Sequence, residues 1–503
     1  MGIREKLISN TFYFFADFVA GTLMGLIFWY IAAKSLIPDD LGKLSTSLNL
    51  AYVVSSISLL GMNYTVWKLI PEYKALKKEK KVISLVRFSS EMILISNILI
   101  LLIFVSFPTY LSSVLKIDIS TVVMTGIIIF ALSFSWFLGF IMWGLQDIRK
   151  LFLSDLLGQI PRILISALLV LFNIKVFGLL IGFLVGMTVT IIPRLFIIPF
   201  RGESINIDKK KVFFKYGIPA TISTGASVFF LNGQYVLLTI LKNTNITGLF
   251  TIAMTLTSFL YLIPNVLTSA LLPISSQLSV DKKNKENLAT SIALIFRYSL
   301  FLSLPIIIFF VSFPGQIILT FSRSEDLPAS ELFPLLSFSS IIYGLGSNFL
   351  QNLYAIGKPK INRDIFIVTS LILLLLSIPL ITIFSAQGLA LSYLISSSFL
   401  FVSSFYFIKK FLNVKIPVKN ISKLIPAILL AFSFIYWTTS FFSGLLFDIV
   451  ISIITLIIYL IILIPFRFYT QEDLKVMEFF STKSPILRKE IKDIYEFLRR
   501  FVK

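Results

Sequence analysis

The 503-residue sequence contains no cysteine and no histidine. Without cysteine the chain has no disulfide bond, no thiolate nucleophile and no cysteine-ligated metal. Without histidine it also lacks the commonest metal ligand and the side chain that most often moves protons near neutral pH. Charged residues are scarce as well, at 14%. The absence of both residue types predicts no metal site, and we also expect no bound cofactor and no catalytic residues.

Long apolar runs dominate the chain instead. Hydrophobic residues make up 57% of it, and the mean hydropathy is +0.92. Runs such as 44–66, 122–144 and 365–384 are nearly free of charge, and each is long enough to cross a bilayer, which takes about 20 helical residues. The sequence therefore predicts an all-α polytopic membrane protein.

About fourteen transmembrane helices can be placed on these runs. Their expected ranges are 11–33, 44–66, 89–107, 122–144, 152–172, 176–199, 218–241, 247–272, 289–313, 332–355, 365–384, 388–407, 424–442 and 446–464. The link at 385–387 is so short that the spans on either side of it are hard to separate.

The distribution of lysine and arginine tests this count. Positive charge is retained in cytoplasmic loops, so alternate loops should be basic if the N-terminus is inside. By this assignment about 38 Lys and Arg residues fall inside and about six outside. The net charge of +20 is then explained by the membrane, without a nucleic acid partner. We expect both termini in the cytoplasm and the protein in the cell membrane.

The two halves of the chain resemble each other. The segment 82–88 matches 292–298, Phe107-Pro108 matches Phe313-Pro314, and Gly42 matches Gly248. An even number of spans in each copy gives both copies the same orientation in the membrane, as in two-lobed transporters. We predict two parallel six-helix lobes at 1–205 and 206–412, two extra helices at 413–465, and a basic amphipathic cytoplasmic tail at 466–503.

Several motifs follow one another in a familiar order. They are Asn10-Thr11 with Gly21 and Gly25, the stretch from Ala33 to Gly42, the stretch from Gly61 to Tyr73, and the stretch from Leu353 to Lys358. In this order and spacing the chain resembles the Wzx-like polysaccharide and oligosaccharide flippases of the multidrug/oligosaccharidyl-lipid/polysaccharide (MOP) transporter superfamily. This superfamily also holds multidrug and toxin extruders and the lipid II flippase.

The resemblance implies a function. A lipid-linked oligosaccharide on polyprenyl phosphate or pyrophosphate would move from the cytoplasmic to the outer leaflet by alternating access, with Na⁺ or H⁺ coupling as an option. The expected partners are this substrate, membrane lipids and glycan-assembly enzymes around a monomer. Two alternatives stay open: a cation or drug exporter of the same fold, and a membrane glycan polymerase or glycosyltransferase.

Charges within spans are costly and are functional hypotheses by default. Arg162 lies about ten residues into its span, so roughly 15 Å deep, and a guanidinium suits phosphate oxygens. Its alternative is a structural pair with Asp155, about two turns earlier. Asp17 lies in the first helix, which lines the cavity in the family, and its carboxylate could couple transport to an ion gradient, with Asp155 as a second candidate.

Arg87 and Arg297 are repeat mates near the cytoplasmic ends of their helices. They are expected either to capture a phosphate head entering from inside or to extend toward the membrane surface. Uncharged polar residues within the spans suit sugar hydroxyls and helix–helix contacts equally well. These candidate substrate-binding residues are Asn232, Gln234, Asn348 and Gln351.

Overall fold

The computed structural model describes residues 3–200, 202–203, 205–278, 282–439, 444–471 and 473–474, and the single positions 493, 495, 496, 499 and 500. Within these residues the regular secondary structure is entirely helical. Helices satisfy their own backbone hydrogen bonds, which a bilayer requires of any spanning segment. The prediction of an all-α polytopic membrane protein is confirmed. The predicted surface helix of the tail lies outside the described residues except for a few isolated positions.

The first half of the chain forms a bundle of helices. They are α1 (Ile3–Ser35), α2 (Pro38–Ser58), α3 (Met62–Ala75), α4 (Glu79–Ser106), α5 (Pro108–Leu115), α6 (Ile119–Leu145), α7 (Ile148–Leu171) and α8 (Lys175–Ile197). Between α2 and α3 the helix axis bends by 51°. The bend lies at Gly61, whose backbone φ of +66° is accessible to glycine at little cost.

The second half forms the next bundle and a C-terminal helix pair. Its elements are α9 (Lys209–Lys211), η1 (Val212–Gly217), α10 (Ile218–Val228), η2 (Phe229–Gly233), α11 (Gln234–Leu241), α12 (Thr244–Thr257), α13 (Phe259–Leu278), α14 (Lys282–Ser312), α15 (Pro314–Phe321), η3 (Ser324–Leu332), α16 (Phe333–Ala355), α17 (Pro359–Leu412), α18 (Val418–Ile421), α19 (Leu424–Thr439) and α20 (Leu445–Ile462). Two of these, η1 and η2, are π-helical.

By length and apolar composition, 11 helices of the described chain can cross a membrane, or up to 12 if the bent pair α2 and α3 is one span. The helix α17 holds two spans, because Ser385 has a non-helical backbone and a Cβ on Gly388 would lie 1.9 Å from the carbonyl oxygen of Leu380. Such an approach requires the chain to reverse direction there. With the 18 residues of α20, about 27 Å long, the described chain accommodates the fourteen predicted spans.

The internal repeat is visible in the backbone. Phe107 has φ −120° and ψ 42°, its mate Phe313 has φ −125° and ψ 41°, and each precedes an eight-residue helix. A Cβ on Gly42 would lie 1.7 Å from the carbonyl oxygen of Thr244, and one on Gly248 would lie 1.9 Å from that of Pro38. These two contacts are equivalent under the repeat, and such reciprocity is what a two-fold axis produces.

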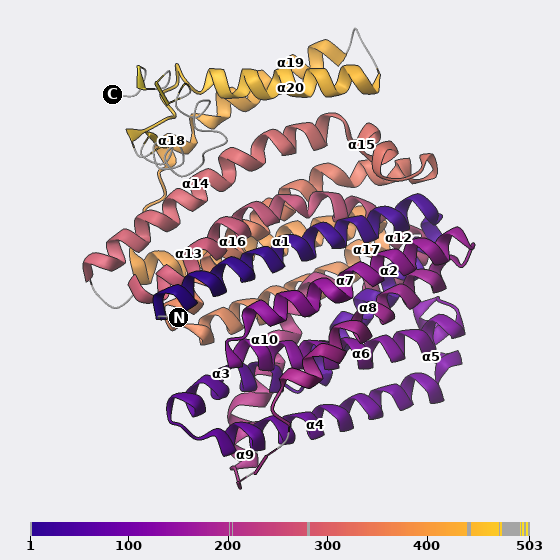
Figure 1. Ribbon diagram of the computed structural model, residues 1–503. Helices are drawn as coiled ribbons and strands as arrows, with labels where there is room; N and C mark the ends of the chain where they lie inside the picture. The colour runs from indigo at the N-terminus through magenta and orange to yellow at the C-terminus, as the bar shows by residue number, and fades with distance from the viewer. Residues whose placement is uncertain are drawn as a thin grey trace.

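Figure 1 shows how the two bundles are arranged. Helices α4, α6 and α8 lie on one side, α13, α14 and α16 lie on the other, and the α19–α20 pair flanks α14. We call the end of the molecule where α1 begins the proximal end. The opposite end, which holds α5, α15 and the turn between α1 and α2, is the distal end.

Candidate functional site

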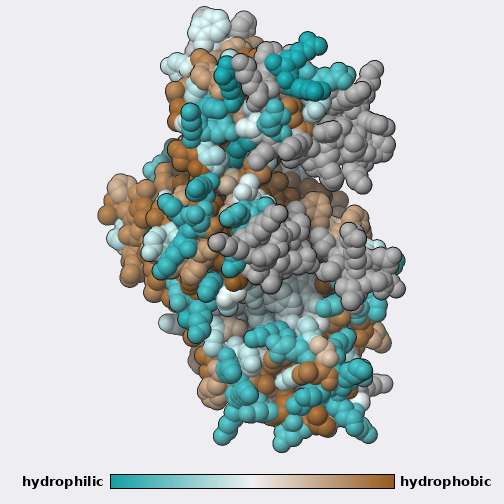
Figure 2. Space-filling view, turned by 90° about the vertical axis from the view of Figure 1, so that its left-hand side faces the viewer, coloured by the Kyte–Doolittle hydropathy of each residue, from teal (hydrophilic) through white to brown (hydrophobic). Residues whose placement is uncertain are grey.

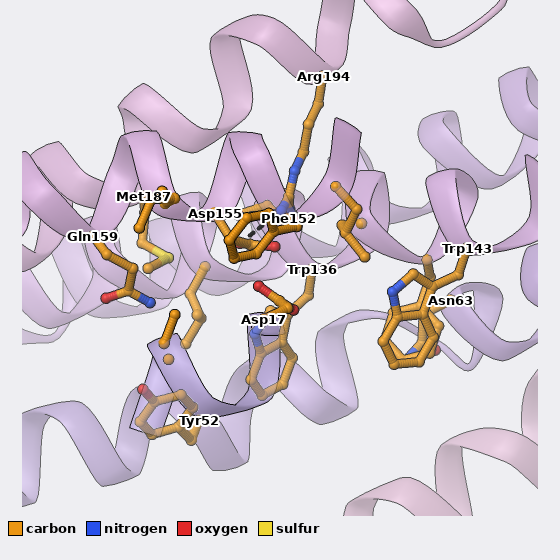
Figure 3. A pocket seen from close by; sticks show the side chains of 18 of the residues that line it. Asp17, Tyr52, Asn63, Trp136, Trp143, Phe152, Asp155, Gln159, Met187 and Arg194 are labelled. Atoms are coloured by element: carbon orange, nitrogen blue, oxygen red, sulfur yellow. Dashed lines mark hydrogen bonds and ion pairs between the residues drawn. The ribbon is translucent and has the colours of Figure 1, made fainter. Parts of the chain in front are cut away.

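A cavity of about 450 Å³ lies within the first bundle, between α1, α2, α3, α6, α7 and α8, with α10 closing it from the second bundle. Its charged side chains are two aspartates and two arginines: Asp17, Asp155, Arg162 and Arg194. Tyr52, Asn63 and Gln159 add neutral polar groups. The remaining wall is strongly aromatic and includes Tyr64, Trp136, Phe140, Trp143 and Phe152. Figure 3 shows several of these side chains turned toward the same space.

Close packing of α7 against α8 fixes the charged wall of the cavity. A Cβ on Gly158 would lie 1.9 Å from the Thr190 hydroxyl oxygen, and one on Gly182 would lie 2.1 Å from that of Ser166. A Cβ on Gly186 would lie 2.7 Å from the Cβ of Arg162. Small residues allow membrane helices to approach this closely. The two helices therefore present Asp155, Arg162 and Arg194 from one tightly packed unit.

Arg194 forms the ion pair of the cavity. Its guanidinium lies 2.7 Å from the carboxylate of Asp155. It also donates from Nε to the Ser154 hydroxyl at 2.9 Å and from Nη1 to the Ser135 carbonyl at 2.8 Å. The Arg194 side chain is almost fully buried and that of Asp155 is 30% exposed. The expected alternative, a pair between Asp155 and Arg162, is therefore wrong.

Arg162 remains without a countercharge. It is 7% exposed, and its guanidinium lies over the rings of Phe28, at 4.7 Å, and Phe183, at 5.4 Å. Among the described residues no carboxylate lies within 4.0 Å of it, and its Nε has no hydrogen-bond partner. A buried cation without a countercharge is costly unless something else binds it. Arg162 is thus a buried cation with no ion pair among the described residues, and its predicted role in binding substrate stays a prediction.

Asp17 completes the set from α1. Figure 3 shows its carboxylate turned toward the Asp155–Arg194 pair across the cavity. It forms no hydrogen bond or ion pair within the described part of the chain. The cavity therefore contains one satisfied pair, Asp155 with Arg194, and two further charges of opposite sign, Asp17 and Arg162. The three residues singled out from the sequence for these spans, Asp17, Asp155 and Arg162, all line this one space.

Several hydrogen bonds between the two bundles lie toward the distal end. The Thr251 hydroxyl donates to that of Ser45 at 2.7 Å, and the hydroxyls of Thr46 and Thr239 lie 2.6 Å apart. Lys34 donates to the Ser322 carbonyl at 2.7 Å. These contacts surround the meeting of Gly42 with α12. Figure 2 shows the proximal end, where hydrophilic side chains border a recess between the halves. The distal end is closed in this conformation.

A family model described as "Polysaccharide biosynthesis protein" matches residues 7–279, more than half of the chain. The chain belongs to this polysaccharide biosynthesis protein family. A second family model, MatE, matches residues 228–383. A comparison with curated proteins gave no match.

Several solved structures share the fold of this family member. One is the lipid II flippase MurJ in an inward closed conformation, with 18% identity, a TM-score of 0.73, and coverage of 90% of this chain and 98% of that one. Another is an inward-facing multidrug resistance MATE family transporter of the MOP superfamily, with 15% identity, TM-score 0.65, and coverage of 78% and 96%. A third is a MOP superfamily transporter from Pyrococcus furiosus described as having a binding pocket of reverse polarity, with 14% identity, TM-score 0.59, and coverage of 81% and 96%. The predicted resemblance to the MOP superfamily is confirmed.

Two arginines expected to bind substrate in this family member lie outside the cavity. Arg87 donates from Nε to the Phe200 carbonyl at 2.9 Å and from Nη2 to the Gly202 carbonyl at 3.0 Å. Ser84, one turn earlier, donates to the Ile205 carbonyl at 2.7 Å and accepts from the Ile205 amide at 2.9 Å. Arg87 therefore fastens the link between the two lobes to α4, and its capture role stays a prediction.

Arg297 has a comparable position in the second lobe. It is 2% exposed and makes a two-pronged pair with Asp473, at 2.7 and 3.2 Å. It also donates to the Phe468 carbonyl at 2.8 Å and lies 4.4 Å above the Phe468 ring. In this conformation its guanidinium is occupied by the segment that follows α20. Substrate capture by Arg297 finds no support here and stays a prediction.

The predicted amides do not line the cavity either. Asn232 and Gln234 each donate to a carbonyl of their own helix segment, at 3.1 and 3.0 Å. Gln351 donates to the Asn265 side chain at 2.8 Å, which joins α16 to α13. Asn348 accepts from Asn352 at 2.9 Å within α16. Of the two interpretations left open for these residues, the structure shows a helix–helix contact for Gln351 alone.

Sequence reasoning missed Arg194. It lies inside the expected span 176–199 and so met the same test of an intramembrane charge that selected Arg162. Gln159 was available in the same way, one turn before Arg162. The positions of Asn63 and Tyr52 in the cavity wall depend on the bend at Gly61 and on the packing of α2. A hydropathy pattern predicts neither of these features.

Proposed function

We propose that this member of the polysaccharide biosynthesis protein family flips a lipid-linked glycan, carried on polyprenyl phosphate or pyrophosphate, from the cytoplasmic to the outer leaflet. The observation that carries the proposal is the buried, uncompensated guanidinium of Arg162 in a polar and aromatic cavity between membrane helices. A phosphate linkage between lipid and sugar supplies the anion that this position requires.

The setting of Arg162 favours a phosphate group. Contacts with Phe28 and Phe183 hold the guanidinium, and a fixed guanidinium donates two parallel hydrogen bonds to an oxyanion with little further loss of side-chain entropy. Aromatic walls such as Trp136 and Trp143 offer flat apolar surfaces for the faces of sugar rings. Tyr52 and Gln159 can hydrogen-bond sugar hydroxyls.

The charge distribution supports loading from the cytoplasm. Lysine clusters at 74–81, 209–211, 358–360 and 409–419 belong to loops at the proximal end, where α1 begins. Basic loops remain in the cytoplasm, so the proximal end is assigned to that side and the protein to the cell membrane. The closed distal end then faces outward, and the conformation is one that accepts substrate from inside.

Transport requires the distal contacts to open in turn. The two lobes meet there through equivalent glycines, and rocking about the repeat axis would separate them while bringing the proximal ends together. This movement requires no catalysis, so we propose a transporter and not an enzyme. We also propose that it acts as a monomer beside the enzymes that assemble the glycan.

A cation or drug exporter is the second candidate, because Asp17 and Asp155 line the same cavity and MatE matches part of the chain. A cationic substrate would bind Asp17 in competition with a proton or Na⁺. Efflux of a cationic dye by the wild type, lost in Asp17→Asn, would favour this candidate.

The test of the flippase uses vesicles that contain a polyprenyl-pyrophosphate oligosaccharide with a dithionite-sensitive fluorophore on its sugar. Wild type should speed the movement of label to the outer leaflet. Arg162→Ala should slow it by tenfold or more, since a hydrogen bond to a charged group contributes about 1.5–3 kcal/mol. Arg162→Lys, which keeps the charge without the planar fork, should fall between them.

The control is Arg363→Ala, since Arg363 forms a partly exposed pair with Asp364 outside the cavity. It should match the wild type. Equal movement in vesicles with and without the wild-type protein would defeat the proposal.

A further inference from the structure

The two arginines of the cavity differ in what they can still bind. Arg194 uses all three nitrogens of its guanidinium within the protein. Its Nη2 lies 2.7 Å from the Asp155 carboxylate, and its Nε and Nη1 donate to the Ser154 hydroxyl and the Ser135 carbonyl at 2.9 and 2.8 Å. The Nε of Arg162 has no partner. Within the described part of the chain, Arg162 is therefore the one unpaired cation that lines this space.

Resting on the proposed function, we infer that the cavity is matched to a single phosphate group, so that the carrier prefers a glycan joined to its lipid by a phosphodiester over one joined by a diphosphate. A phosphodiester carries one negative charge, and a diphosphate with both ends esterified carries two. The planar fork of Arg162 can neutralise one phosphate through two parallel hydrogen bonds. A diphosphate still binds, but its second charge meets no second cation.

The depth of Arg162 keeps that second charge inside the cavity. Arg162 lies fourteen residues after Ile148, where α7 begins, which is about 21 Å along the helix from the proximal end, and it is 7% exposed. The two phosphorus atoms of a diphosphate share one bridging oxygen, so the second phosphate lies directly beside the first. It therefore remains between membrane helices, where a charge without a countercharge is costly.

The rest of the polar wall suits hydroxyl groups better than a second oxyanion. Asp17 and Asp155 bring negative charge to the cavity, and Oε1 of Gln159 and Oδ1 of Asn63 are buried acceptors without a partner. Sugar hydroxyls can donate to these oxygens, whereas the oxygens of an ionised phosphate cannot. Neutral donors of the wall can hydrogen-bond a second phosphate but do not cancel its charge. A sugar that follows directly after one phosphate therefore complements this wall.

The experiment compares three probes that share farnesol and glucose and differ only in the link between them. Farnesyl glucoside has no phosphate, glucosyl-phospho-farnesol has one, and glucosyl-diphospho-farnesol has two. Binding to the purified full-length protein is measured in phosphatidylcholine nanodiscs at one pH and one ionic strength. Empty nanodiscs give the partitioning of each probe into lipid, which is subtracted.

Wild type should bind the phosphodiester about tenfold or more tightly than either other probe, because a hydrogen bond to a charged group contributes at least about tenfold to binding. Arg162→Gln should remove the advantage of the phosphodiester over the glucoside. Gln159→Arg places a second guanidinium one turn before Arg162 and should strengthen diphosphate binding, which narrows or reverses the preference. The control Gln387→Arg adds the same charge at an exposed position bonded to Glu331, outside the cavity, and should keep the wild-type preference.

Diphosphate binding as tight as phosphodiester binding in the wild type, or tighter, would overturn the inference. A phosphodiester preference that persists in Arg162→Gln would also overturn it, as would unchanged diphosphate binding in a Gln159→Arg protein that still binds the phosphodiester. In each of these outcomes the flippase proposal stands. No binding of any of the three probes by the wild type would overturn the proposed function itself, and this inference with it.

Discussion

The closed distal end gives a prediction that can be worked from coordinates. We expect the double substitution Gly42→Ala/Gly248→Ala to force this end open. The added methyl groups would lie 1.7 and 1.9 Å from backbone oxygens of the opposite lobe, and Cβ contacts under 3.0 Å essentially never occur in proteins. The obstructing atoms are backbone, so no side chain can move aside, and α2 and α12 must separate by at least about 1 Å.

This separation would break the neighbouring hydrogen bonds, because Thr239 of α11 is joined to α12 by its 2.8 Å hydrogen bond with Thr247. The bonds Ser45–Thr251 and Thr46–Thr239 are 2.7 and 2.6 Å long, and a further 1 Å places both beyond hydrogen-bond distance. Each contributes about 0.5–1.5 kcal/mol, so the closed state loses about 1–3 kcal/mol before any packing loss is counted. The ratio of closed to open molecules should fall by about fivefold to more than a hundredfold.

The assay is a distance measurement between spin labels. The chain has no cysteine, so Lys116→Cys and Lys242→Cys supply the only two labelling sites, on opposite lobes at the distal end. Pulsed electron spin resonance should show a short distance in the parent and a longer population in the alanine variant. The control is Gly21→Ala/Gly25→Ala, since a Cβ at either position meets nothing within 4 Å. If the alanine variant kept the short distance and the wild-type flipping rate, the contact at Gly42 and Gly248 would not be what closes the distal end.

Three further predictions concern the contacts made by Arg194, Arg297 and Arg87. Asp155→Asn leaves Arg194 without its countercharge. It should lower the free energy of unfolding by about 3 kcal/mol, the low end for a broken buried pair because Asp155 is 30% exposed, and this would be seen as a lower Tm in detergent. Asp155→Asn/Arg194→Gln should recover part of the loss, and additive losses would contradict the pairing. Asp473→Asn removes the partner of Arg297 and should make the segment after α20 cleavable by protease while flipping continues. Asp493→Asn is the matched control change. An unaltered digestion pattern in Asp473→Asn would show that the Arg297–Asp473 pair does not hold this segment in place. Arg87→Ala should likewise expose the interlobe link to protease without weakening glycan-lipid binding, and tenfold weaker binding with unaltered proteolysis would instead favour the capture role.

Much of the fold could be predicted from the sequence, because a bilayer imposes a local rule. Every span must bury about 20 consecutive residues in hydrocarbon. The apolar runs, the short link at Ser385 and the alternation of basic loops can therefore all be recognised from the order of the residues. The repeat was visible for a related reason: Gly42 and Gly248 must both be glycine where equivalent backbones meet. Arg162 and Asp17 were found because a charge inside a span is conspicuous.

The partners of those charges could not be predicted in the same way. Asp155 had a nearby candidate partner in Arg162, seven residues away. Its actual partner is Arg194, which lies 39 residues after Asp155 in the sequence. Arg297 pairs across 176 residues with Asp473. Arg87 binds backbone carbonyls, which carry no sequence signature at all.

The sequence by itself determined that the chain is a helical protein with many membrane spans, that its halves are related, and that Asp17, Asp155 and Arg162 are charges within those spans. The tertiary structure decided which of those charges are neutralised and which stay open to ligands. The physical reason is that hydrophobic burial depends on residues adjacent along the chain, whereas an ion pair depends on which helices pack together, and glycines such as Gly158 and Gly186 set that packing at distances no linear pattern specifies.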